Sequence, residues 1–161
     1  AHVIDVIAPQ VKNIVISANR NIEKYAAFSY PVIKDQYEGF CGPLAGIDAG
    51  FIETTTPYLL CIPCDTPLLP TDLLNTLYAS LQATSEAMAI ATDSRREHPV
   101  INLMRRSVAE DVRCQLELGD LKLMNWIDKT GYARVDFSER AQVLSNLNTP
   151  EAIKEFENKN A

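Results

Sequence analysis

Short apolar runs, separated by turns and amphipathic stretches, recur along most of the chain. They predict buried strands at residues 13–18, 31–34, 57–63, 87–91, 98–103, 132–135 and 143–144. Apolar residues at helical spacing predict helices at residues 3–7, 42–51, 71–83, 108–118 and 122–128, and a last helix that opens at Thr149 and Pro150. Strands that alternate with helices are typical of the α/β class. We therefore expect a three-layer, mostly parallel, doubly wound (Rossmann-like) sheet.

The composition indicates a single domain. The chain has 161 residues, of which 47% are hydrophobic, so it can bury one sizeable core. No apolar run approaches the roughly 20 residues that cross a bilayer, and we expect a cytoplasmic protein without membrane contact. The formal net charge of -6 argues against a partner that is bound through nucleic-acid phosphates.

Ligands of such sheets bind at the carboxyl ends of the strands, and an acidic residue stands at one of them. Asp65 follows the apolar run 57–63 and lies between Pro63 and Pro67. A carboxylate in this position can bind Mg²⁺, which bridges one or two carboxylates to nucleotide phosphates. A turn aspartate that caps backbone amides explains the same residue. The spacing alone does not decide between a metal ligand and a turn residue at Asp65.

Four motifs in a fixed order carry a resemblance to a known family. They are GPLAGI at 42–47, PCDTPLLP at 63–70, EHP at 97–99 and NLNTPEAI at 146–153. In this order they resemble the molybdenum cofactor guanylyltransferases, and the similarity covers essentially the whole chain. The resemblance implies a fold of the nucleotide-diphospho-sugar transferase type. It also implies the Mg²⁺-dependent transfer of GMP from GTP to molybdopterin, which gives the guanine dinucleotide cofactor and pyrophosphate.

The resemblance also implies roles for individual residues. Asp65 would hold Mg²⁺ and act in catalysis, and GTP would lie against Ser17, Asp35 and Asp65. Ser17 departs from the family, which more often has Asn there. Residues implied near the pterin are Arg20, Arg96, His98, Asn146 and Asn148. The two asparagines are equally well explained as turn and helix-cap residues, and His98 as a hydrogen-bonded residue at a strand start.

The family's front segment has no counterpart in this sequence. Members begin with a strand and a Gly-rich loop that carries an Arg and a Lys, and the loop grips the GTP phosphates. We expect this chain to be the remainder of a longer enzyme that lacks its first strand and phosphate loop here, and to transfer GMP poorly or not at all by itself. The expected partners are GTP, molybdopterin and, transiently, other proteins of cofactor biosynthesis or acceptor proteins.

Two other classes of function stay open. Cys61 and Cys64 have the spacing of a redox pair or of half a zinc site. The Pro residues around them keep the stretch from running into a helix, which disfavours a redox pair. The other class is a non-catalytic relative that binds a nucleotide or a protein without turnover.

Overall fold

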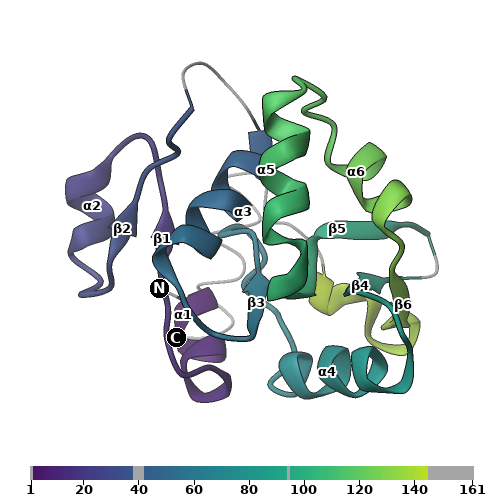
Figure 1. The fold of residues 1–161 in the computed structure, drawn as a ribbon. Coiled ribbons are helices and arrows are strands. Elements are labelled where there is room, and N and C mark those ends of the chain that lie inside the picture. The colour runs from purple at the N-terminus through teal and green to yellow at the C-terminus, as the bar shows by residue number, and fades with distance from the viewer. Residues whose placement is uncertain (1, 38–41, 94, 145–161) are drawn as a thin grey trace.

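In the part of the chain that the structure describes, the strands form two sheets. The computed structural model describes residues 2–37, 42–93 and 95–144, without the side chains of residues 141–143 (Figure 1). β1 (Ile16–Ser17) pairs in parallel with β2 (Val32–Ile33). The second sheet has the order β3 (Tyr58–Cys61), β5 (Glu97–Arg105), β4 (Met88–Thr92) and β6 (Ala133–Asp136).

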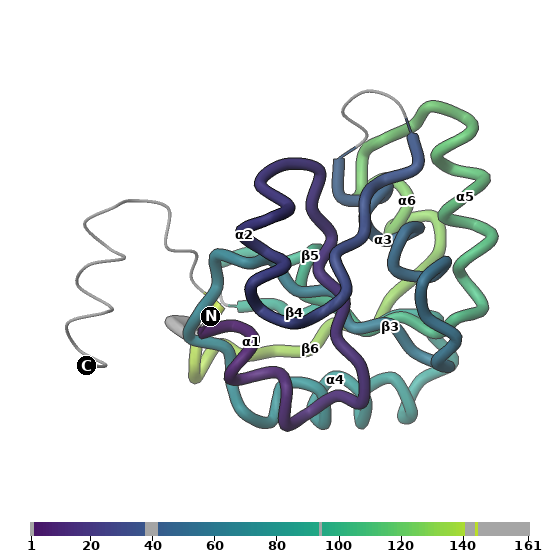
Figure 2. The backbone as a smooth tube through the Cα atoms, turned by 90° about the vertical axis from the view of Figure 1, so that its left-hand side faces the viewer, coloured from purple at the N-terminus to yellow at the C-terminus, as the bar shows by residue number. Residues whose placement is uncertain are grey.

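Helices cover both faces of the four-stranded sheet. The helices of the described residues are α1 (His2–Ile7), α2 (Ile22–Ala26), α3 (Gly42–Glu53), α4 (Leu73–Ala83), α5 (Ala109–Glu117) and α6 (Leu123–Thr130), with 3₁₀ turns at Ala8–Gln10, Arg106–Val108 and Ser138–Leu144. Figures 1 and 2 show α3, α5 and α6 on one face and α4 on the other. Two hydrophobic cores lie on opposite faces of the sheet. Met88 and Ile90 of β4 pack into the core that contains Leu44 of α3, and Ala89 and Ala91 pack into the core that contains Leu77 of α4. Because successive side chains of a strand point to opposite faces, this alternation confirms the three layers.

β5 is the exception to the expected parallel order. It runs antiparallel to both β3 and β4, whereas β4 and β6 are parallel. Only residues 93–96 join β4 to β5, and a parallel neighbour would need a crossover of a dozen or more residues. The α/β architecture is confirmed, and the short connection explains the one reversed strand.

Most predicted elements are found with shifted ends. The strand expected at 13–18 is shortened to Ile16–Ser17, and the helix expected at 71–83 begins at Leu73. The strand expected at 143–144 is wrong, since these residues belong to the 3₁₀ turn Ser138–Leu144. Two apolar residues in a row are too short a window to identify a strand. The expected helix from Thr149 lies outside the described residues.

Within the described part of the chain, no helix is both long enough and apolar enough to span a bilayer.

Candidate functional site

Ser17 and Asp35 come together at the carboxyl ends of β1 and β2. The parallel register pairs Ser17 with Ile33, and Asp35 follows two residues later. A Cβ at Gly46 of α3 would lie 3.1 Å from Ser17 Oγ and 4.0 Å from Asp35 Oδ1. The two predicted GTP ligands therefore lie against one position of α3 that has no side chain, where a larger residue would press on Ser17.

Asp35 is held by one neighbour and has one acceptor left. Asn19 Nδ2 donates to Asp35 Oδ2 over 2.7 Å, and the Asp35 backbone N–H donates to Asn19 Oδ1 over 3.0 Å. Asp35 Oδ1 is buried and has no hydrogen-bond partner among the described residues. A buried carboxylate oxygen without a partner is costly, so this atom indicates a place where a ligand donates.

The segment after Asp35 is anchored on the far side of α3. Tyr37 Oη donates to Oδ2 of Asp48 over 3.2 Å, and Asp48 is 1% exposed. The guanidinium of Arg113 lies 3.6 Å from Asp48 Oδ1. Burial, and then the charge of Asp48, raises the pKa of Tyr37, so its hydroxyl stays protonated and remains a donor at neutral pH. This anchor limits the freedom of the loop that carries Asp35.

Asp65 lies in the turn that follows β3, as predicted. The residue is half-buried, and its Oδ1 is shielded from solvent. The lining of a cavity of about 820 Å³ includes both Ser17 and residues Cys61–Cys64, which directly precede Asp65. Ser17 and the segment that leads into the Asp65 turn thus line the same cavity.

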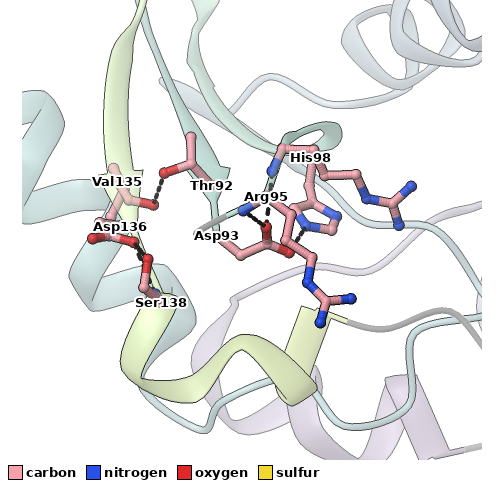
Figure 3. Close-up of polar contacts among 8 residues, drawn as sticks. Thr92, Asp93, Arg95, His98, Val135, Asp136 and Ser138 are labelled. Atoms are coloured by element: carbon pink, nitrogen blue, oxygen red, sulfur yellow. Dashed lines mark hydrogen bonds and ion pairs between the residues drawn. The ribbon is translucent and has the colours of Figure 1, made fainter.

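His98 belongs to a separate polar group at the turn between β4 and β5 (Figure 3). His98 Nε2 lies 2.7 Å from Asp93 Oδ2, and the backbone N–H groups of Arg95 and Arg96 donate to Asp93 Oδ1 over 2.7 and 2.9 Å. The hydrogen bond from His98, followed by those two backbone bonds, lowers the pKa of Asp93 to about 2. His98 is 6% exposed. A nearly buried histidine that is hydrogen-bonded to Asp93 stabilises the turn between β4 and β5.

The remaining predicted pterin residues are not gathered at one point. Arg20 is exposed beside a hollow of about 350 Å³ that residues 19–24 line. Arg96 is exposed in the turn with His98. Among the described residues, no hydrogen bond or ion pair joins Arg20 to Arg96 or His98. Asn146 and Asn148 lie outside the described residues.

Two residues of these groups lie just after predicted strands, but the sequence assigned neither of them a role. Asn19 forms a hydrogen bond with Asp35, 16 positions away in the sequence. Asp93 forms one with His98, 5 positions away. Asn19 stands two residues after Ser17, on the same side of the strand, and this spacing was the signal available.

The oxygen donors of the site suit a magnesium ion that arrives with a nucleotide. In the described part of the chain, no group of three or more His, Cys, Asp or Glu side chains forms a metal site. Mg²⁺ is usually held by one or two carboxylates together with substrate phosphates and water. The half-buried carboxylate of Asp65 therefore fits a bridging ion, whereas no protein cage is present among these residues.

The structure disfavours Cys61 as the reactive member of a thiol pair with Cys64. Cys61, Cys64 and Cys114 are free thiols. Burial raises the pKa of Cys61 to about 12, so this thiol does not ionise at neutral pH. Cys64 is exposed. A redox pair needs a thiolate attacker, and the half-buried Cys61 does not provide one.

Known structures resemble this fold. Molybdopterin-guanine dinucleotide biosynthesis protein A from Archaeoglobus fulgidus superposes with a TM-score of 0.77, covering 98% of this chain and 83% of that chain at 18% identity. The synthetase of CMP:2-keto-3-deoxy-manno-octonic acid, complexed with CTP, superposes with a TM-score of 0.69, covering 98% of this chain and 85% of that chain at 12% identity. At these identities the likeness shows the fold alone.

Sequence comparison shows the family. A molybdenum cofactor guanylyltransferase of Shewanella loihica is 44% identical over 150 residues, which are 93% of this chain and 76% of that protein. A protein of the same name from Shewanella putrefaciens is 41% identical over 155 residues, 96% of this chain and 80% of that protein. Residues 1–135 match the family described as the MobA-like NTP transferase domain. The chain therefore belongs to the MobA-like NTP transferase domain family.

Proposed function

We propose that the protein containing this chain transfers GMP from GTP to molybdopterin. The relatives from Shewanella bear the name of that activity. The observation that carries the proposal is the group formed by Ser17, Asp35 and Gly46. A hydroxyl and a buried, unsatisfied carboxylate oxygen flank a helix position without a side chain, within reach of one another. This group offers acceptors to N–H or O–H donors of a nucleotide base or ribose.

The reaction needs no covalent intermediate with the protein. A terminal phosphate oxygen of molybdopterin attacks the α-phosphorus of GTP. The bond from that phosphorus to the oxygen that bridges to the β-phosphate breaks, and pyrophosphate leaves with the electron pair. Catalysis of such a transfer depends on positioning and on neutralising the charge of the phosphates.

The proposal gives each site residue a separate role. Ser17 and Asp35 orient the nucleoside of GTP, and Asp65 would hold Mg²⁺. When bound, the ion would neutralise charge on the phosphates. The catalytic residue proposed in this chain is Asp65, because its carboxylate would hold the ion that supplies this neutralisation.

The cationic side chains are assigned to the anionic pterin. Arg20 and Arg96 are exposed and stand out on a chain of net charge -6. His98 is already bonded to Asp93 and nearly buried, so it supports the turn of Arg96 and offers little surface of its own. Asn146 and Asn148 complete the proposed pterin set, from outside the described residues.

We also propose that one more strand lies between the two sheets in the complete protein. Among the described strands, β1 pairs with β2 and β3 pairs with β5, so each leaves one edge unpaired. The cavity of about 820 Å³ lies between these two edges, with Ile16 and Leu60 in its lining. An apolar strand that pairs with both edges would satisfy their backbone groups and fill the cavity. Hydrogen exchange tests this: the amides of β1 and β3 should exchange more slowly once the sequence upstream in the gene is restored.

The proposed setting is the cytoplasm, without nucleic acid or membrane as partner. Free thiols at Cys61, Cys64 and Cys114 suit a reducing compartment. The net charge of -6 disfavours binding to the anionic surface of a nucleic acid or a membrane. Transient contact with other proteins of cofactor biosynthesis or acceptor proteins belongs to the same proposal.

Calorimetric titration of Mg·GTP and Mg·CTP tests the function. The protein is titrated as residues 1–161 and with the upstream sequence of its gene restored. GTP-selective binding, followed by formation of the guanine dinucleotide cofactor and pyrophosphate by the longer form, is the expected result. Binding of GTP without turnover in the longer form would favour the non-catalytic relative, and binding of neither nucleotide would refute the proposal.

A further inference from the structure

Asn19 bonds to Asp35 at two points, which fix both the backbone and the side chain of that residue. The Asn19 amide donates from Nδ2 to Asp35 Oδ2 over 2.7 Å, and its Oδ1 accepts the Asp35 backbone N–H over 3.0 Å. The bond from Nδ2 restrains the carboxyl group of Asp35, and the bond to Oδ1 holds the backbone that carries it. The orientation of the carboxyl group is therefore set by Asn19.

The strand register explains why these two residues meet. Ile16 pairs with Val32 and Ser17 with Ile33, so partners are offset by 16 positions. The backbone N–H of Ala18 still donates to Ile33 O over 2.9 Å beyond the last strand pair. Asn19 and Asp35 keep the same offset of 16. The side-chain pair therefore continues the parallel ladder of β1 and β2 at the site end.

The pairing decides which oxygen of Asp35 is available. Asn19 occupies Oδ2, and Oδ1 is left buried without a hydrogen-bond partner in the described part of the chain. That oxygen lies 4.0 Å from the position of a Cβ at Gly46, with Ser17 Oγ on the same side at 3.1 Å. The free acceptor thus faces the place where Ser17 and the bare helix backbone meet.

We propose that Asn19 is a positioning residue for the nucleotide site: it fixes Asp35 so that Oδ1 accepts a hydrogen bond from the nucleoside of GTP. The inference rests on the proposed function, since it needs GTP at this site. Asn19 does not touch the reacting atoms and acts through Asp35. Its side chain is exposed, so its bonds contribute little to the stability of the fold, and its removal should be felt in ligand affinity.

The test is Mg·GTP affinity in Asn19→Ala, measured by calorimetry on the protein with its upstream sequence restored. We expect the dissociation constant to rise about tenfold, which corresponds to about 1.4 kcal/mol, with the melting temperature nearly unchanged. Asn125→Ala is a matched control, because Asn125 Nδ2 also donates to an aspartate, Asp120, over 3.2 Å at an exposed position of α6. This control should change neither quantity.

Two further variants separate positioning from a direct contact. In the Asp35→Ala background, the additional change Asn19→Ala should cost no further affinity, because Asn19 would have nothing left to orient. Asn19→Asp keeps an acceptor for the Asp35 backbone N–H but puts a carboxylate where Nδ2 donated. It should bind GTP no better than Asn19→Ala.

The outcomes are distinguishable. If the unchanged protein does not bind Mg·GTP, the proposed function fails. If it binds and Asn19→Ala binds equally well, or if the losses of Asn19→Ala and Asp35→Ala add up, the positioning role is overturned while the proposed function stands.

Discussion

Gly46 of α3 is the position where folding stability and nucleotide binding should respond in opposite directions. Replacing a helix-interior glycine by alanine stabilises the helix by roughly 0.5–1 kcal/mol. The new Cβ would lie 3.1 Å from Ser17 Oγ, so the exposed Ser17 side chain must shift by a few tenths of an ångström. A strained rotamer costs about 0.5–1.5 kcal/mol. The two effects nearly cancel, and Gly46→Ala should change the free energy of unfolding by less than about 1 kcal/mol.

The same methyl group should block the nucleotide. It would stand between Ser17 and Asp35 Oδ1, 4.0 Å from that oxygen. A hydrogen bond to a charged acceptor contributes roughly 1.5–3 kcal/mol. Losing it should raise the dissociation constant of Mg·GTP about 10- to 100-fold.

Gly50, one turn further along the same helix, supplies the control. A Cβ there would meet Leu59 Cδ2 at 3.2 Å, an apolar neighbour on β3. Gly50→Ala gains the same helix propensity and should leave GTP affinity unchanged. Calorimetry gives the affinities and urea unfolding the stabilities. Equal GTP affinity in Gly46→Ala and the unchanged protein would refute the placement of the nucleoside beside α3.

Three other changes test separate parts of the molecule. Asp65→Ala should abolish the Mg²⁺ dependence of GTP binding while circular dichroism stays unchanged, and metal-dependent binding that persists would remove Asp65 from the site. Asp93 has a pKa lowered to about 2, so the stability that it contributes is present above its unfolded value near 3.8 and is lost as the pH falls towards 2. The stability difference between the unchanged protein and Asp93→Asn, measured by urea unfolding, should therefore shrink from pH 4 to pH 2, and a constant difference would contradict this. Arg106 donates to the backbone carbonyls of Phe51, Thr54 and Thr56. Arg106→Ala should lower the free energy of unfolding by about 2–4 kcal/mol, and Arg106→Lys should recover little of it; a loss below about 0.5 kcal/mol would contradict the role of these bonds.

Local patterns predicted much of the fold because the elements carry strong local signals. The leucines of α4 recur at helical spacing, and Leu73, Leu77 and Leu81 are all fully buried. The apolar run bounded by prolines became β3, with Asp65 in the following turn. The direction of β5 could have been read from the four residues between β4 and β5, since so short a connection excludes a parallel crossover.

The sequence did not predict the hydrogen-bonded residue pairs that shape the site. Asn19 meets Asp35 only because β1 and β2 are parallel with an offset of 16, and no sequence pattern states that register. His98 was expected near the pterin or as a hydrogen-bonded turn residue. Its partner Asp93 depends on the close β4–β5 turn (Figure 3). Polar contacts of this kind follow from tertiary geometry, which hydrophobic periodicity does not determine.

One helix explains how the two sheets would contribute to one proposed site. α3 packs on both, and it approaches each through a glycine: Gly46 faces Ser17 and Asp35, and Gly50 faces Leu59 of β3. Glycines four residues apart lie on one face of a helix, so the backbone of α3 comes close to both sheets at once. Asp48, between them in sequence, turns to the other side and holds Tyr37. The spacing between the nucleoside group at β1 and the Asp65 turn after β3 is therefore set by α3. A larger side chain at Gly50 should widen that spacing and impair transfer of GMP more than binding of GTP.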